Sequence, residues 1–265
     1  MSCTGERWAA MLAAALVAMM VAALCVGCGS TEGSSGANDP SDSDNGSLFV
    51  DEEEDVDGEA AMPAGADTIY MCGRSVLGEW FDHWGWDYDP EDPVLMDGYS
   101  LVYVEMDVPP GIVDTASEAA REAADGGGQV MFFKLCFDDF EGGDEDAARD
   151  NLARNMRIAG EVVEAAVDEE GLILILGNAL PKVREYTDEW LVWNQREYNR
   201  LLQELADASG GRIVVLDLYG TLAASGGWLE PGYAADPYDS HLNDAAYEAL
   251  DVVLSDVLAG LPGGG

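Results

Sequence analysis

From residue 67 onward, short runs of apolar residues alternate with longer amphipathic stretches. Five runs are expected to be strands, at residues 68–72, 100–105, 130–135, 172–176 and 212–216. Helices are expected at residues 75–84, 114–124, 144–167, 188–208 and 243–261. Runs such as LILIL and IVVL are apolar at every position, which is typical of strands covered on both faces. The alternation predicts an α/β fold, a three-layer α/β/α sandwich around a five-stranded parallel sheet.

The first 66 residues have a composition that does not suit a packed core. Residues 8–27 carry no charged side chain, and residues 28–66 are rich in Gly, Ser, Asp and Glu. A segment of low hydrophobicity and dense negative charge cannot offset the entropy lost on folding. We therefore expect an export segment over residues 1–27, an acidic disordered linker over residues 28–66 and one folded domain over residues 67–262.

Cys28 directly follows the apolar segment, and the small residue Gly27 precedes it. The run Leu-Cys-Val-Gly-Cys resembles a bacterial lipoprotein signal, which implies that Cys28 becomes the lipid-bearing first residue. The apolar segment is also nearly long enough to span a bilayer, so an uncleaved amino-terminal helix is the alternative. In both cases the domain is expected to be anchored to the cell membrane, outside the cytoplasm.

The charge of the chain is strongly one-sided, with 12 Lys and Arg against 52 Asp and Glu and a formal net charge of −40. Nucleic-acid binding depends on neutralising phosphates with cations, so nucleic acid is not expected as a partner. The charge suits solubility outside the cell, or an affinity for cationic polymers. No Cys or His cluster has the spacing of a metal site, and neither a metal nor another cofactor is expected.

The folded region contains only two histidines, His83 and His241. His241 stands in the segment Pro-Tyr-Asp-Ser-His-Leu-Asn, just before the last expected helix, and Asp239 precedes it by two residues. A serine nucleophile normally needs an imidazole to take its proton and a carboxylate to orient that imidazole. Asn243 at the end of the segment is expected to cap the helix. The segment is also compatible with a simple surface turn, since Asp, Ser, Asn and Pro are ordinary turn residues.

Ser75 follows the first expected strand in a Gly-Arg-Ser turn and begins the next expected helix. Its hydroxyl would project beyond the carboxyl edge of the sheet, where ligands bind in such folds, and its own N–H can stabilise an oxyanion. A helix-capping serine is the alternative. Because the fold brings the first strand and the last loop to the same edge, we predict a catalytic triad of Ser75, His241 and Asp239.

With these residues, the region resembles the SGNH, or GDSL-like, hydrolase family, whose sheet is flavodoxin-like. In that family a nucleophilic serine follows the first strand in a Gly-Asp-Ser turn, and an Asp and a His precede the last helix. The resemblance implies a serine ester hydrolase with Ser75 as nucleophile, acting on small acyl esters that include O-acylated glycans. A catalytically weak binding lipoprotein that captures a glycan or a cationic partner is the alternative.

Three features differ from the family pattern. Arg74 replaces the acidic residue of the turn, the late pair is spaced Asp-x-His instead of Asp-x-x-His, and no Gly-x-Asn follows the run at residues 130–135. The candidates that remain for contacts to an oxyanion or to the substrate are Gly73, Arg74, Asp139 and Asn178. Arg74 can bind an anionic group or pair with a neighbouring carboxylate, Asp138 or Asp139, and we expect the pairing.

Two further features leave alternatives open. Cys72 and Cys136 end two neighbouring expected strands, so the sequence is compatible with a disulfide or with two buried thiols. The aromatic segment around His83, Trp-Phe-Asp-His-Trp-Gly-Trp, is compatible with core packing or with a surface that stacks on a sugar ring.

Overall fold

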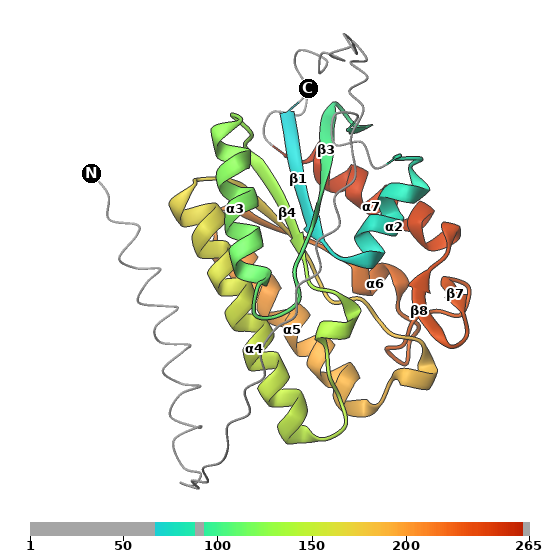
Figure 1. Ribbon diagram of the computed structural model, residues 1–265. Helices are drawn as coiled ribbons and strands as arrows, with labels where there is room; N and C mark the ends of the chain where they lie inside the picture. The colour runs from blue at the N-terminus through green and yellow to red at the C-terminus, as the bar shows by residue number, and fades with distance from the viewer. Residues whose placement is uncertain (1–66, 88–92, 262–265) are drawn as a thin grey trace, which may run out of the picture. The chain divides into compact units, whose positions relative to one another are not determined.

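The computed structural model describes residues 67–87 and 93–261, so the expected export segment, Cys28 and the acidic linker lie outside the described residues. Six strands form one sheet in the order β2-β3-β1-β4-β5-β6, with helices on both faces (Figure 1). The strands are β1 Asp67–Gly73, β2 Val94–Met96, β3 Tyr99–Glu105, β4 Val130–Lys134, β5 Ile173–Gly177 and β6 Ile213–Leu216. Every neighbouring pair is parallel except β2 and β3, which are antiparallel.

The predicted α/β sandwich with five parallel strands is confirmed, and the order β3-β1-β4-β5-β6 is the flavodoxin-like order. The sheet has one strand more than the five predicted. The additional strand, β2, is joined to β3 by a two-residue turn in which Asp97 and Gly98 have φ angles of 49° and 84°. An Asp-Gly pair suits such a turn because both central residues need a positive φ.

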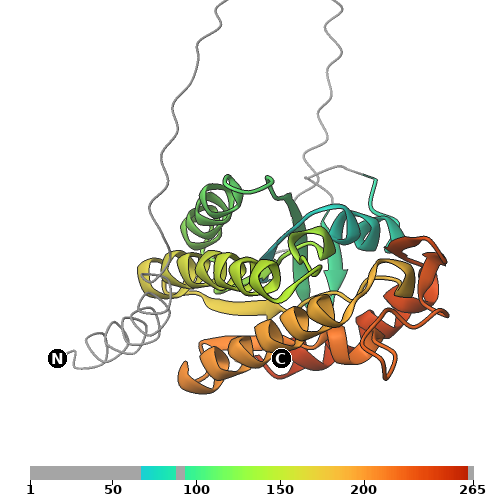
Figure 2. The ribbon, with the colours of Figure 1, turned by 90° about the horizontal axis from the view of Figure 1, so that it is seen from below.

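The helices are α2 Ser75–His83, α3 Ile112–Asp125, α4 Glu145–Val163, α5 Glu189–Ala208, α6 Leu218–Leu222 and α7 Asp244–Ala259. The five predicted helices are present with small differences at their ends, and a π-helical segment, Glu164–Glu169, follows α4. Helices α3, α4 and α5 cover one face of the sheet, whereas α2, α6 and α7 cover the other (Figures 1 and 2). Among the described residues, no helix combines the length and the apolar character that a membrane crossing requires.

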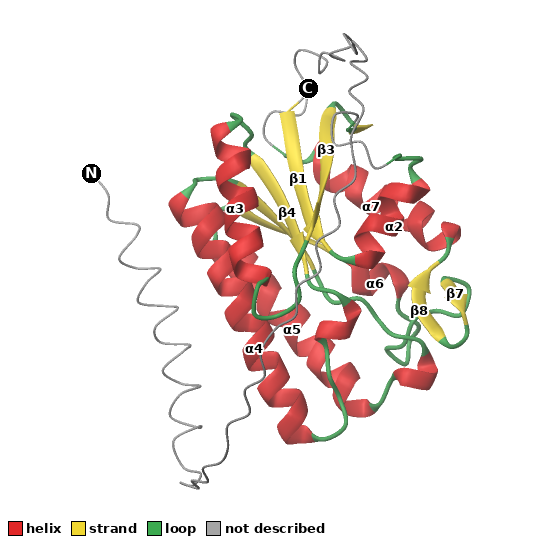
Figure 3. Cartoon of the chain, viewed as in Figure 1, coloured by secondary structure: helices red, strands yellow, loops and turns green. Residues whose placement is uncertain are grey.

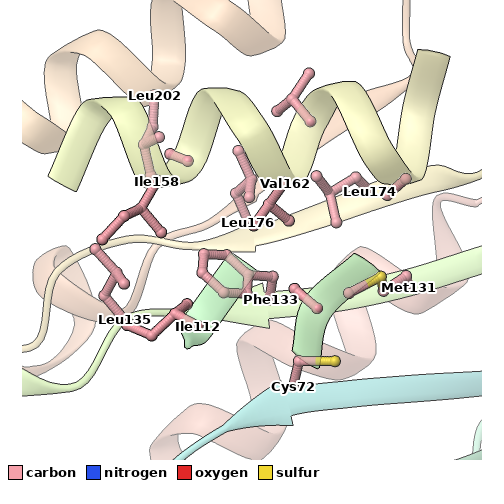
Figure 4. Close-up of a cluster of buried hydrophobic side chains, with 14 of the residues drawn as sticks. Cys72, Ile112, Met131, Phe133, Leu135, Ile158, Val162, Leu174, Leu176 and Leu202 are labelled. Carbon is pink, nitrogen blue, oxygen red and sulfur yellow. The ribbon is translucent and has the colours of Figure 1, made fainter. Parts of the chain in front are cut away.

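Strand β4 illustrates why these strands are apolar at every position. Successive side chains of a strand point to opposite faces of the sheet. Met131 and Phe133 are fully buried beneath α3, α4 and α5 (Figure 4), and Val130 and Phe132 are buried beneath α2, α6 and α7. Each face therefore contributes its own hydrophobic cluster, and the strand is apolar on both sides up to Lys134 at its end.

The two cysteines of the domain are buried, free thiols. Cys72 packs in the cluster beneath α3, α4 and α5 (Figure 4), whereas Cys136 belongs to the cluster on the opposite face. Burial raises the pKa of Cys72 far above its ordinary value, which disfavours the reactive thiolate. Of the two alternatives, the structure thus has two buried thiols and no disulfide between these residues.

A separate two-stranded hairpin, β7 Ala234–Asp236 and β8 Asp239–Leu242, precedes α7 (Figure 3). The sequence predicts an irregular turn at this point. The backbone instead pairs with itself in an antiparallel hairpin, and this regular structure holds the segment that contains Asp239 and His241.

Candidate active site

The topology of the sheet changes direction between β1 and its neighbour β4. The chain leaves β1 through α2 on one face and reaches β4 through α3 on the other. In sheets of this kind, ligands bind beyond the carboxyl ends of the two strands at such a switch point. The segments at this place are residues 73–75 after β1 and residues 135–139 after β4.

Ser75 is the first residue of α2 and is exposed. Gly73 allows the helix to begin this close to β1, because a Cβ atom at Gly73 would lie 2.8 Å from Leu77 Cδ2. The N–H groups of Ser75 and Val76 belong to the first turn of α2, where the helix itself supplies no acceptor. The predicted nucleophile thus stands beside two backbone donors that can stabilise an oxyanion.

Asp239 and His241 form a hydrogen-bonded pair on β8. Nδ1 of His241 lies 2.6 Å from Asp239 Oδ1, and the backbone N–H of His241 donates to the same oxygen at 3.0 Å. These two bonds, the backbone one first, lower the pKa of Asp239 below its ordinary value. An ionised carboxylate only accepts hydrogen bonds, so Nδ1 is the donor of this bond and the tautomer that it favours has its lone pair on Nε2.

The strand conformation accounts for the unusual Asp-x-His spacing. Side chains two residues apart on a strand point to the same side. Asp239 and His241 therefore face the same side of β8, while Ser240 between them is buried on the other. A spacing that is shorter than the family's Asp-x-x-His is therefore the natural spacing for two side chains on one side of a strand.

Side-chain hydrogen bonds fix the hairpin to the domain. The Ser240 hydroxyl accepts from the backbone N–H of Val183 at 3.2 Å. Asn243 donates to two backbone carbonyls of the preceding segment, and its Oδ1 accepts from the N–H of Ala246 at 3.1 Å. Asn243 therefore caps α7, as predicted, and also ties the helix to the hairpin.

The imidazole of His241 faces helix α2. Its Nε2 lies 3.7 Å from Oε1 of Glu79, which stands one helical turn after Ser75 on the same face. Ser75 and Glu79 are four residues apart and share one face of α2, so the imidazole lies beside the helix face that also carries Ser75. Among the described residues, the Ser75 hydroxyl has no hydrogen-bond partner. The structure brings base and carboxylate together and places them against the helix of the predicted nucleophile.

The candidate residues after β1 and β4 are bound to each other. Arg74 lies 2.5 Å from Oδ1 of Asp139, which is only 3% exposed, and Asp139 Oδ2 accepts from the N–H of Cys136 at 2.7 Å. The expected pairing of Arg74 with a nearby carboxylate is thus present. Both side chains are occupied by an ion pair that joins the two segments.

Asn178 stands at the end of β5, where its amide links two loops. Its Nδ2 donates to Asp217 at 2.7 Å, and its Oδ1 accepts from the backbone N–H of Tyr219 at 2.8 Å. The side chain is 5% exposed. In this arrangement Asn178 holds the segment after β6 in place, and its carbonyl and one of its two amide hydrogens are already used.

Three buried amides that the sequence analysis did not single out hold the loop after β4. Asn151 and Asn155 each donate to the backbone carbonyl of Asp139 at 2.9 Å. Asn194 donates to the carbonyl of Glu141 at 2.9 Å and to Asn151 at 2.7 Å. Asparagine is uncommon in buried helix faces, so three of them in predicted helices are a signal of such a network.

Lys134 is a fourth buried polar residue near the site that was not among the candidates from the sequence. It ends β4 and is 3% exposed, and its Nζ has one long hydrogen bond, 3.4 Å, to the carbonyl of Leu135. Burial lowers its pKa, and the nearby Cys136 and Asp139 oppose that shift. The sequence does contain a sign of this residue, because a lysine that ends an otherwise apolar strand is unusual.

A pocket of about 390 Å³ opens beside His241, lined by Phe137, Asp138, Lys182, Tyr186, Tyr238, Asp239, Ser240 and His241. The Phe137 ring meets the His241 ring edge-on at 5.3 Å, and Lys182 lies 3.4 Å from Asp138. Tyr186 and Tyr238 are more than half exposed on the rim. A larger cavity, about 640 Å³, lies along α5 and includes Trp193 and Trp228, but none of the predicted site residues lines it.

The aromatic segment around His83 packs α2 against α7. Trp80 and Phe81 are fully buried. The indole N–H groups of Trp80 and Trp84 both donate to Asp251 at 2.8 Å, and His83 lies 3.4 Å from Asp244. Of the two alternatives for this segment, the structure therefore shows core packing.

Comparison with known proteins bears on the fold. No protein-family model matches the sequence, and no curated protein matches it. Among solved structures, a GDSL-like lipase from Bacteroides thetaiotaomicron has a TM-score of 0.51 and 12% sequence identity, covering 72% of this chain and 87% of its own. A lipase/acylhydrolase from Enterococcus faecalis has a TM-score of 0.45 and 14% identity, covering 74% of this chain and 96% of its own. The first of these likenesses carries the assignment: the domain has the fold of the GDSL-like, or SGNH, hydrolases.

Proposed function

We propose that the protein is a serine ester hydrolase that acts by acyl transfer through Ser75, His241 and Asp239. The observation that carries the proposal is the hydrogen-bonded Asp239–His241 pair, whose Nε2 lies 3.7 Å from Glu79 on the face of α2 that also carries Ser75. The pair stands at the carboxyl edge of a sheet whose fold is shared with a GDSL-like lipase. A base, its orienting carboxylate and an exposed serine at one edge are the parts that acyl transfer requires.

In the proposed reaction, Ser75 Oγ attacks the ester carbonyl while His241 Nε2 takes the hydroxyl proton. The developing oxyanion binds the N–H groups at the start of α2. His241 then gives the proton to the leaving alcohol oxygen, and water hydrolyses the acyl-enzyme with His241 again as base. Asp239 holds the ring in the required tautomer and stabilises the imidazolium. The reaction requires Ser75 Oγ to come within ~3 Å of Nε2, and catalytic hydrogen bonds often tighten to that length only when substrate is bound.

The substrates that we propose are small acyl esters, including O-acylated glycans. The exposed rings of Tyr186 and Tyr238 beside the pocket support this choice, because an aromatic ring with a polar hydroxyl offers an apolar face to a sugar and a wet edge to solvent. We also propose that the domain is displayed outside the cytoplasm and anchored to the cell membrane, through a lipid on Cys28 or through an uncleaved helix over residues 8–27.

The competing proposal is a catalytically weak binding protein that keeps the fold and captures a glycan or a cationic partner. The observation that favours it is the absence of a hydrogen bond between Ser75 and His241 among the described residues. A binding protein does not need that contact, whereas a hydrolase must form it during the reaction.

A fluorophosphonate probe separates the two proposals, because it labels only a serine that a neighbouring base activates. We expect wild-type protein to be labelled and Ser75→Ala to be unlabelled, together with hydrolysis of short acyl esters by wild type only. Ser255→Ala, on α7, removes a serine outside the site and should be labelled like wild type. Absence of both labelling and esterase activity in wild type would favour the binding protein.

A further inference from the structure

Glu79 stands beside the atom that must protonate the leaving group. In acyl transfer the base returns its proton to the oxygen of the departing alcohol, so that oxygen must come within ~3 Å of His241 Nε2. Oε1 of Glu79 lies 3.7 Å from the same nitrogen. The alcohol portion of any substrate therefore passes close to the Glu79 carboxylate.

The position of this carboxylate is set by contacts across the α2–α7 interface. The Tyr247 hydroxyl lies 3.1 Å from Glu79 Oε2 and 3.3 Å from the backbone carbonyl of Val76. The second oxygen, Oε1, is the one that faces His241. Glu79 is 41% exposed, so a group of the substrate can reach it without displacing core side chains.

No fixed cation neutralises Glu79 among the described residues. His241 is its one partner within ion-pair distance, and that ring is already bound to Asp239. The cations near the site are used elsewhere, because Arg74 pairs with Asp139 and Lys182 lies beside Asp138. The side of His241 that the alcohol must occupy is therefore lined by a carboxylate with an unmatched negative charge.

We propose that Glu79 determines specificity by favouring esters whose alcohol portion carries a positively charged amino or quaternary ammonium group. The inference rests on the proposed hydrolase function and names the substrate class of the same site. A cation two or three bonds beyond the ester oxygen comes close to Oε1 when that oxygen meets Nε2. An anionic alcohol would face like charge in the same position and is disfavoured.

Two acetate esters of nearly identical shape test the proposal. One is the acetate of choline, and the other is 3,3-dimethylbutyl acetate, in which carbon replaces the charged nitrogen. We expect the ratio of their kcat/KM values in wild type to favour the cation by about twofold to fivefold, the range of an exposed ion pair. Glu79→Gln should bring this ratio near one, whether the individual kcat/KM values for the two esters rise or fall.

The matched control is Glu248→Gln, which changes the net charge by the same amount on the exposed side of α7. Glu248→Gln should keep the wild-type ratio, because it removes one negative charge from the protein but leaves the carboxylate beside His241 in place. An equal fall of the ratio in both variants would assign the preference to the overall charge and overturn the role of Glu79. A ratio that Glu79→Gln leaves unaltered would overturn it as well.

A binding measurement keeps the test independent of turnover. Choline and 3,3-dimethylbutanol are titrated into wild type, Glu79→Gln and Glu248→Gln while the ring signals of the two histidines are followed by NMR. Choline should perturb His241 more strongly than the neutral alcohol does, and Glu79→Gln should remove the difference. If choline binds as before in Glu79→Gln, or shows no preference in wild type, the inference fails even where the hydrolase proposal holds. A hydrolase failure shows separately, as no turnover of either ester with the choline preference intact.

Discussion

At the scale of the residue, Asp239 has two hydrogen bonds to His241, and only one of them sets the tautomer. In Asp239→Asn the amide can present an N–H to Nδ1, which favours the ring proton on Nε2, where a base needs a lone pair. We expect kcat for a short acyl ester to fall by ~10²-fold or more, with KM little changed; the same exchange in the serine-protease triad costs roughly 10⁴-fold. Steady-state kinetics with unfolding curves as the folding control measure this. Equal turnover in the variant would remove Asp239 from the mechanism.

Lys134 is a buried charge without an ion-pair partner among the described residues, and its removal should stabilise the protein. Lys134→Met is unbranched and only one atom shorter, and Asp139 retains Arg74 as its partner. We expect the free energy of unfolding at pH 7 to rise by about 1 kcal/mol or more, because a buried ammonium loses its hydration and the one long hydrogen bond of Lys134 offsets little of that loss.

The sign of the pH dependence follows from the lowered pKa of Lys134. Because the folded pKa lies below the unfolded value near 10.5, the unfolded chain binds more protons between the two values, and wild type gains stability as pH rises through that interval. The advantage of Lys134→Met should therefore shrink as the pH rises from the folded pKa toward 10.5, which urea unfolding at a series of pH values measures. A variant that is less stable at pH 7 would show that the lysine is held by attraction to Asp139.

At the scale of the element, the start of α2 depends on Gly73. A methyl group there would press on Leu77, so Gly73→Ala should cost about 1–3 kcal/mol of unfolding free energy and displace Ser75. Gly160→Ala in α4 is the matched control, because a Cβ at Gly160 meets nothing within 4 Å and alanine should stabilise the helix by about 0.5–1 kcal/mol. Opposite signs in urea unfolding would support the close packing of α2 on β1, and equal signs would contradict it.

The elements that the sequence predicts well are those whose environment is uniform. Strands such as β4 and β5 are buried on both faces, and burial on both faces is what their continuous apolar runs predict. Strand β2 has only three residues, two half-buried and Leu95 exposed, so its own pattern is weak. The sequence feature that indicates β2 is the Asp97-Gly98 pair, which forms the turn between β2 and β3.

In the candidate site as well, some residues can be predicted from local sequence patterns and others cannot. Ser75, Asp239 and His241 could be proposed from the sequence because Ser75 follows a strand and the Asp-x-His pair is close in sequence. Glu79 is not, because its importance comes from contacts with Tyr247 and His241, residues that lie more than 150 positions away along the chain. Contacts of this kind depend on how α2 packs against α7 and the hairpin, which no local pattern records.

At the scale of the whole molecule, the formal charge of −40 should act against compactness. Added NaCl screens the repulsion, so Tm should rise between 0.01 M and 0.5 M salt, by about 3 °C for each roughly 1 kcal/mol gained. Scanning calorimetry at several concentrations measures this. The gain should level off once the Debye length falls to a few ångströms, whereas an effect that keeps growing with salt would have another origin.

The hairpin that holds Asp239 and His241 has a consequence for how the gene can vary. Because successive side chains of β8 alternate in direction, inserting or deleting one codon between these residues would turn the carboxylate away from the ring. The turn at residues 237 and 238 lies before both residues. Its length can change while Asp239 and His241 stay two residues apart, on the same side of β8. Length variation among descendants of this gene should therefore collect in that turn and spare the three codons from Asp239 to His241.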